Sequence, residues 1–236
     1  MLPQTRLIRE SLIKKPLGRQ IELLRDAYAG LEGYCVACGP SATSIYSHKH
    51  KQLAKDRVTF TIKQAISILP DCDFHLFNII HLDKWSYSSQ HPITVSTYNN
   101  RIHPISDIEI EAKITRWLSQ SCEWNEWTFD KTLTRPWGPG ILMELGIYLW
   151  KHIGLKKVYI IGWDLGPVLD NNTIGHFYGS TKTKMEKGEL QSLIEGSQSM
   201  YEWLRSVDVE LVLVSDRSLL SKSIPRCYDP FFKLHC

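Results

Sequence analysis

A helix that is apolar on nearly every side is followed at once by a short apolar strand, and this pair constrains the fold more than any other feature. Residues 140–153 read GILMELGIYLWKHI, and residues 157–161 read KVYII. Gly154, between them, is a natural end for the helix. A helix without a polar face is buried on several sides, and so short an apolar run is typical of a strand inside a sheet. The two segments predict a helix-to-strand unit of an α/β protein.

The same alternation runs along most of the chain. Further strands are expected over 34–38, 57–62, 74–77, 93–97 and 209–214. Further helices are expected over 45–55, 107–119 and 185–206, with Asp107 as the N-cap of the second. Alternating strands and helices favour crossover connections and a mainly parallel sheet flanked by helices. We therefore expect a Rossmann-like α/β fold.

The first 29 residues show helical spacing of apolar residues, interrupted at Pro16-Leu17-Gly18. We expect two helices there, which form an N-terminal helical extension over residues 1–29. The remaining residues, 30–236, are expected to form one α/β domain. A chain of 236 residues suits this division.

Charge and composition exclude several classes of protein. The net charge of +3 comes without a basic stripe, so we expect no nucleic-acid partner. No apolar run approaches the roughly 18 residues of a transmembrane segment, and no signal sequence is seen. We therefore expect a cytoplasmic protein whose six cysteines are free thiols, with Cys35 and Cys38 as buried core residues rather than a redox or metal pair. The sequence leaves a homo-oligomer open.

Two turns stand where an open parallel sheet binds its ligands, beyond the carboxyl ends of the strands. Gly39-Pro40-Ser41 follows the first predicted strand, and the turn containing Asp164 follows the strand over 157–161. Glycine lets a ligand approach the backbone, and the serine adds a hydroxyl donor. An ordinary strand-to-helix turn is the alternative interpretation of the first turn, and capping is the alternative role for Asp164.

Three further residues have side chains that suit catalysis or phosphate binding. His176 stands in a polar loop and has a side chain whose pKa suits a general base, although a surface histidine is the simpler interpretation. Tyr178 can donate to a leaving phosphate or can simply pack, and Arg135 can hold a phosphate or simply be solvated. Glu144 lies inside the apolar helix, so it should have a partner there.

Several of these segments resemble, in the same order, segments of known proteins. The segments are 34–45 (YCVACGPSATSI), 59–64 (TFTIKQ), 73–78 (DFHLFN), 138–164 and 176–180 (HFYGS). The chain thereby resembles two related groups, the small bacterial sialyltransferases that use CMP-sialic acid and the family of the archaeal 6-hydroxymethylpterin diphosphokinase. The resemblance covers roughly residues 30–215, and each motif is short.

The resemblance implies a Rossmann-like nucleotide-binding domain over residues 30–236. It implies nucleotide-binding roles for Gly39, Pro40, Ser41, Gln64, Asn78, Gly138, Gly140 and Asp164, and catalytic roles for His176, Tyr178 and Arg135. The sequence also departs from the sialyltransferase pattern. Cys38 and Lys63 replace asparagines, and Ser180 stands where those enzymes carry their catalytic histidine.

Three functions follow as expectations. The first is a glycosyltransferase-like enzyme that moves a sugar from a nucleotide-activated donor, with a CMP-sugar favoured, to a glycan or other hydroxyl acceptor, and that requires no cofactor or metal. The second is a magnesium-dependent diphosphokinase that acts on a pterin-like alcohol, with Asp164 as the natural metal ligand. The third is a non-catalytic nucleotide- or sugar-binding protein of the same fold, which Ser180 supports.

Overall fold

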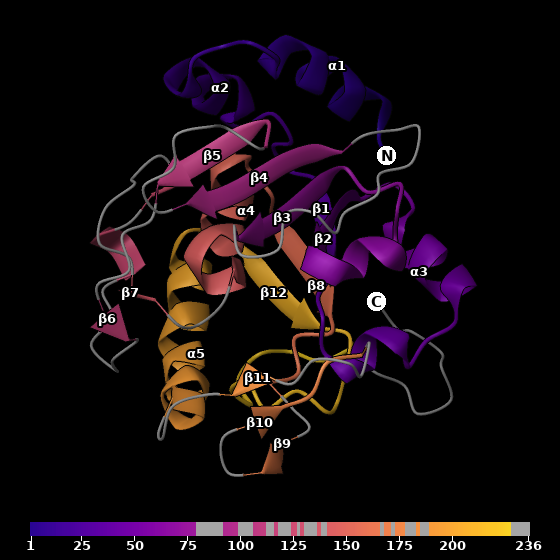
Figure 1. The fold of residues 1–236 in the computed structure, drawn as a ribbon, viewed down its shortest axis with the longest axis vertical. Coiled ribbons are helices and arrows are strands. Elements are labelled where there is room, and N and C mark those ends of the chain that lie inside the picture. The colour runs from indigo at the N-terminus through magenta and orange to yellow at the C-terminus, as the bar shows by residue number, and fades with distance from the viewer. Residues whose placement is uncertain are drawn as a thin grey trace.

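The protein is built around a parallel sheet (Figure 1). The computed structural model describes residues 1–78, 92–98, 106–111, 116–117, 124–126, 128–129, 136–137, 141–165, 168–170, 173–177, 183–184 and 189–227. Seven strands in the described part lie in the order β12-β8-β1-β2-β3-β4-β5, and all neighbouring pairs are parallel. Their bounds are β1 Glu32–Val36, β2 Val58–Ile62, β3 Phe74–Asn78, β4 Ile93–Tyr98, β5 Ile108–Glu111, β8 Lys157–Ile161 and β12 Glu210–Leu213. The predicted Rossmann-like α/β fold is confirmed.

Helices and short turns connect these strands. The α-helices of the described part are α1 Pro3–Leu12, α2 Leu17–Leu24, α3 Ser47–Ala54, α4 Ile147–His152 and α5 Glu189–Ser206. The short helical turns are η1 Pro40–Thr43, η2 Lys63–Ser67, η4 Trp124–Glu126 and the π-helical turn Leu142–Gly146, which runs directly into α4. Small strands form two further sheets: β6 Arg116–Trp117 with β7 Pro136–Trp137, and β9 Val168–Asp170, β10 Thr173–Ile174 and β11 Thr183–Lys184.

The sheet separates two apolar layers, because successive side chains of a strand point to opposite faces. In β1, Cys35 faces the larger core cluster, which includes residues of α1, α2, α4 and α5. Its neighbours Tyr34 and Val36 face the smaller cluster, which includes residues of α3, η1 and η2. Both faces of β1 are therefore covered, as expected for the central strand of a parallel sheet.

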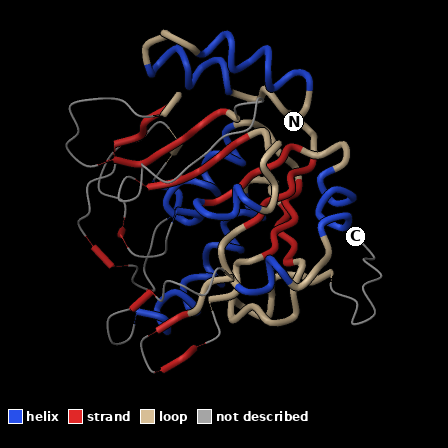
Figure 2. Tube along the Cα trace, turned by 45° about the vertical axis from the view of Figure 1, so that its right-hand side comes forward, coloured by secondary structure: helices blue, strands red, loops and turns tan. Residues whose placement is uncertain are grey.

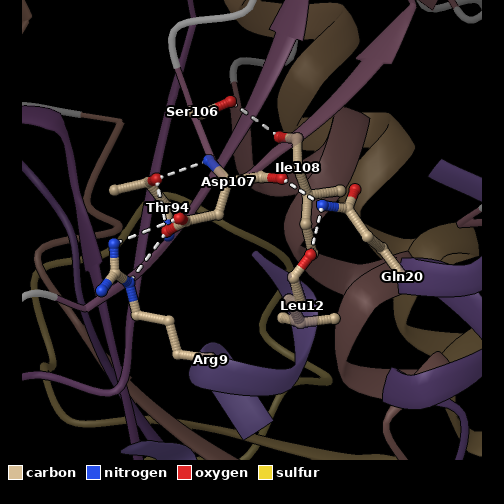
Figure 3. Close-up of polar contacts among 7 residues, drawn as sticks. All are labelled: Arg9, Leu12, Gln20, Thr94, Ser106, Asp107 and Ile108. Carbon is tan, nitrogen blue, oxygen red and sulfur yellow. Dashed lines mark hydrogen bonds and ion pairs between the residues drawn. The ribbon is translucent and has the colours of Figure 1, made fainter. Parts of the chain in front are cut away.

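The N-terminal helices lie over the β4–β5 end of the sheet (Figure 2), and α2 contacts β5. Asp107 is the centre of the polar contacts (Figure 3). Its carboxylate accepts hydrogen bonds from the backbone N–H and the hydroxyl of Thr94, each at 2.9 Å, and forms an ion pair with Arg9 at 3.2 Å. The amide of Gln20 donates to the carbonyl of Asp107 at 2.8 Å. The predicted extension over 1–29 thus shares contacts and core with the domain over 30–236, and this division stays a prediction.

The predicted helix over 107–119 is wrong. Its start is the strand β5, which pairs in parallel with β4. Ile108 and Ile110 are both fully buried, and residues two apart share a face only in a strand. Asp107 does not cap a helix, since its carboxylate accepts hydrogen bonds from Thr94 of the neighbouring strand instead.

Other predictions agree with the structure. The break at Pro16-Leu17-Gly18 falls between α1 and α2, and Gly154 ends the buried helix with a φ of +82°. Cys35, Cys38 and Cys72 are buried free thiols. Cys227 is disulfide-bonded, so the expectation of free thiols is wrong at that residue. Among the described helices, none is both long and apolar enough to span a membrane.

Candidate functional site

The carboxyl ends of β1 and β8 meet at the point where the strand order reverses. The chain moves from β1 to β2 on one side, and β8 lies on the other side of β1. Such a reversal is where an open parallel sheet usually binds its ligand. The predicted turns at Gly39–Ser41 and Asp164 both lie here, although they are more than 120 residues apart in sequence.

These two turns are bonded to each other. The backbone N–H of Ser41 donates to Oδ2 of Asp164 at 2.7 Å, and the Ser41 hydroxyl donates to Oδ1 at 2.6 Å. The Gly162 N–H donates to the same serine oxygen at 2.9 Å, and the Gly39 N–H donates to the Gly162 carbonyl at 2.6 Å. The N–H and hydroxyl of Ser41, which the sequence led us to expect at a phosphate, therefore already donate to the carboxylate of Asp164.

Burial also changes the pKa of Asp164. The side chain is 3% exposed, and burial raises the pKa of its carboxyl, while the bonds from Ser41 and the charge of Arg217 oppose that rise. The hydroxyl of Ser215 opposes the rise as well. Arg217 and Ser215 come from the loop after β12, which sequence reasoning missed because only the folded sheet brings β12 beside β8.

Lys63 supplies a cation at the same edge. It is the first residue after β2 and has a φ of +46°, a backbone conformation that non-glycine residues rarely adopt. Its side chain is half-buried, and burial lowers the pKa of the ammonium, although the charges of Cys38 and Glu144 oppose this. Within the described residues, the ammonium of Lys63 makes no hydrogen bond or ion pair of its own. Strained residues of this kind cluster at ligand sites.

His176 lies beside the end of β1. The N–H of Phe177 donates to the Cys38 carbonyl at 3.0 Å, which fixes this loop against the strand. Burial and the charge of Lys63 lower the pKa of His176, while a hydrogen bond from its ring to the backbone of Cys38 opposes that effect. The imidazole is therefore neutral near pH 7. A neutral imidazole has one unprotonated nitrogen, which can act as a base.

The structure thus brings five predicted residues to one edge: Gly39, Pro40, Ser41, Asp164 and His176. Gln64 joins them through η2, since its side-chain oxygen lies 3.8 Å from the Cys38 sulfur. Asn78 ends β3 at the same edge of the sheet. Four further predicted residues lie outside the described part: Tyr178, Arg135, Gly138 and Gly140.

Lys63 and Glu144 complete the charges at this edge. Glu144 is 7% exposed in the π-helical turn before α4, and its charge acts on Lys63. The bonding partner expected for this buried carboxylate stays a prediction. The position of Lys63, directly after a strand, is the same signal that identified Gly39, so sequence reasoning could have found it.

The described residues contain no cluster of three or more His, Cys, Asp or Glu side chains suited to a metal ion. No family model, curated protein or solved structure matches the chain. The proposal below therefore stands on the geometry of this edge and on the motifs in the sequence.

Acid is expected to destabilise the fold through His50, on the far side of η1. Its Nε2 donates to the Ala42 carbonyl at 2.9 Å, and its Nδ1 lies 2.8 Å from the Tyr34 hydroxyl, which donates to it when the buried ring is neutral. Burial lowers its pKa below the ordinary 6.5. The unfolded chain then binds more protons, and the free energy of unfolding should fall as the pH falls below 6.5.

Urea titrations above and below that pH measure the effect. His50→Gln should flatten the dependence, since glutamine can still donate to Ala42 but takes up no proton. His48→Gln, which changes an exposed ring in the same helix, is the matched control and should leave the dependence as it is. Equal slopes in the wild type and His50→Gln would contradict the assignment.

Proposed function

We propose that the chain is a glycosyltransferase-like enzyme that binds a nucleotide-activated sugar at the carboxyl edge of β1, β2 and β8. The observation that carries the proposal lies at the topological reversal of the sheet. There the half-buried ammonium of Lys63, which makes no hydrogen bond or ion pair with the residues that the structure describes, acts on the neutral imidazole of His176. A cation there suits a phosphate, and a neutral imidazole suits proton removal. The motifs shared with the sialyltransferases make a CMP-sugar the first donor to test.

The chemistry follows from these two groups. The unprotonated nitrogen of His176 takes the proton of an acceptor hydroxyl, and the oxygen attacks the anomeric carbon of the donor sugar. The bond from that carbon to the phosphate oxygen breaks, and the nucleotide leaves with the electron pair. Lys63 stabilises the charge on the departing phosphate. Gln64, which follows it in η2, contacts the nucleotide or sugar in this proposal.

In this proposal Lys63 contacts the phosphate, a role that the sequence analysis gave to Ser41. A phosphate at Ser41 would compete with the carboxylate of Asp164 for both donors. The same contact bears on the diphosphokinase alternative, because it holds the predicted metal ligand, Asp164, against its own chain. The backbone around Gly39 and Pro40 can still border the ligand, since glycine leaves its surroundings open to close approach.

A thermal-shift screen tests the proposal. CMP, CDP, UDP, GDP, ADP and ATP are compared with and without magnesium, because a ligand that binds only the native state raises its melting temperature. We expect a metal-independent shift with a cytidine or uridine nucleotide. That shift should vanish in Lys63→Gln and persist in Lys55→Gln, a control that removes an exposed lysine from the end of α3.

Catalysis needs a second readout. With a stabilising CMP-sugar, release of CMP in the presence of acceptor sugars should be lost in His176→Ala, while the thermal shift is kept. Binding without release in the wild type would favour the non-catalytic binding protein. A shift with ATP and magnesium alone would favour the diphosphokinase, and no shift with any nucleotide would overturn the proposal.

A further inference from the structure

The turn that carries Lys63 is held from both sides by side chains of the neighbouring strands. Lys63 directly follows β2, which lies between β1 and β3 in the sheet. On one side, the thiol of Cys38, two residues past β1, donates to the Ile62 carbonyl at 3.1 Å. On the other side, Nε2 of His75 in β3 donates to the Lys63 carbonyl at 3.0 Å. Two consecutive carbonyls at the end of β2 therefore accept hydrogen bonds from side chains.

His75 is held rigidly inside the sheet. It is 0% exposed, and its Cα pairs with that of Thr61 in β2. The centre of its ring lies 5.1 Å from that of Phe77. Since a carbonyl can only accept, the contact with Lys63 places a proton on Nε2. A buried imidazole that is fixed in this way holds the carbonyl to which it donates in one direction.

The backbone at Lys63 needs such support. Its φ of +46° lies in the left-handed region, which is unfavourable for every residue except glycine. A strained conformation persists only where the surrounding structure holds it. The direction of a carbonyl follows from the ψ angle of its own residue, so the bond from His75 acts on the strained residue itself. The ammonium of the candidate site is attached to that residue.

We propose that His75 is a positioning residue, which keeps the backbone of Lys63 in the conformation that directs its ammonium to the candidate site. His75 acts through the Lys63 backbone and does not contact the ligand. The charge of the ammonium acts on His176, and the charges of Cys38 and Glu144 act on the ammonium. The effect of His75 on ligand binding rests on the proposed function, whereas its effect on Lys63 does not.

Two variants of His75 separate this role from a general loss of stability. Glutamine at this position can still donate to the Lys63 carbonyl, whereas leucine cannot. The first measurement is the pKa of Lys63, followed by NMR of carbon-13-methylated lysines, which requires no ligand. Burial lowers that pKa in the wild type. We expect it to rise toward the ordinary 10.5 in His75→Leu, because a released turn lets the ammonium reach water, and to stay low in His75→Gln.

Nucleotide binding is the second measurement. For a nucleotide that stabilises the wild type, His75→Leu should weaken binding about tenfold, the effect of one misplaced charge-assisted contact. His75→Gln should bind as the wild type does. If no nucleotide stabilises the wild type, the proposed function fails, and the pKa of Lys63 still tests the positioning role.

His152→Leu is the matched control. Nε2 of His152 donates to the Ile21 carbonyl at 2.8 Å, which is a bond of the same kind. His152 lies in the segment that precedes β8, at the opposite edge of the sheet. The control should leave the pKa of Lys63 and nucleotide binding unchanged. The proposal is overturned if His75→Leu also leaves that pKa unchanged, or if His75→Gln raises it as far as leucine does.

A further pair of variants tests the strain where His75→Leu does not fold. Glycine adopts a φ of +46° without strain, and alanine does not. Both substitutions at Lys63 remove the ammonium, so their difference reports on the backbone alone. Lys63→Gly should therefore melt at a higher temperature than Lys63→Ala. Equal melting temperatures would show that the turn needs no support, and the role of His75 would be refuted.

Discussion

Gly162→Ala is expected to lower the free energy of unfolding by about 3 kcal/mol or more. Gly162 has a φ of +81°, where an L-residue is strained. A Cβ there would lie 2.3 Å from the Ala37 carbonyl oxygen and 2.7 Å from its carbon. Both atoms belong to the backbone of the residue that directly follows β1, so neither can move without disturbing the bond from the Ala37 N–H to the Ile161 carbonyl. Urea unfolding followed by circular dichroism measures the loss.

Gly18→Ala is the matched control for that experiment. Gly18 lies in α2, and nothing stands within 4 Å of the position its Cβ would take. Alanine there should stabilise the protein by about 0.5–1 kcal/mol, because glycine is a poor helix former. If Gly162→Ala unfolds at the same urea concentration as the wild type, the close packing of the β1 and β8 turns is contradicted.

The succession of strands and helices along the chain could be predicted because the central elements are buried on both faces. A strand such as KVYII and a helix such as 140–153 carry no polar face, so their apolar runs stand out from the rest of the chain. The ends of two helices could also be predicted from the sequence. Proline and glycine at 16–18 and glycine at 154 act through local backbone geometry, which needs no knowledge of the fold.

The error at 107–119 has a different cause. Aspartate before an apolar segment is a common helix start, but here it bonds a threonine in the neighbouring strand. The same arrangement occurs at Asp73, whose carboxylate accepts from the backbone N–H and hydroxyl of Thr59 at 2.8 and 2.7 Å. In each case the aspartate precedes one strand and the threonine is the second residue of the strand beside it. The acceptor is satisfied across the sheet, so local sequence alone gives the wrong element.

The candidate site was predictable in place but not in its contacts. Position after a strand identified Gly39, Ser41 and Asp164, because every parallel strand delivers its following residues to one edge. The bond between Ser41 and Asp164 joins residues 123 apart and depends on the order of the strands. That order also brings Lys63 and His176 together, and single-sequence periodicity cannot supply it.

Asp164→Ala is expected to lower the free energy of unfolding by about 3 kcal/mol, because it leaves the buried N–H and hydroxyl of Ser41 without their acceptor. Asp164→Asn should cost only about 1 kcal/mol. Asparagine keeps one carbonyl oxygen for the Ser41 N–H, and it removes a buried charge whose desolvation raises the pKa of the native carboxyl.

A double-mutant cycle with Ser41→Ala isolates the contact itself. The coupling between the two side chains should be about 1.5–3 kcal/mol, the range of a hydrogen bond to a charged group. Coupling near zero would mean that the Ser41 hydroxyl does not hold the carboxylate in solution. In that case Asp164 would be available to a ligand after all, and the nucleotide screen should then lose its response in Asp164→Asn as well as in Lys63→Gln. Coupling in the expected range, together with an unchanged thermal shift in Asp164→Asn, would mean that Asp164 supports the structure of the site while Lys63 contacts the ligand.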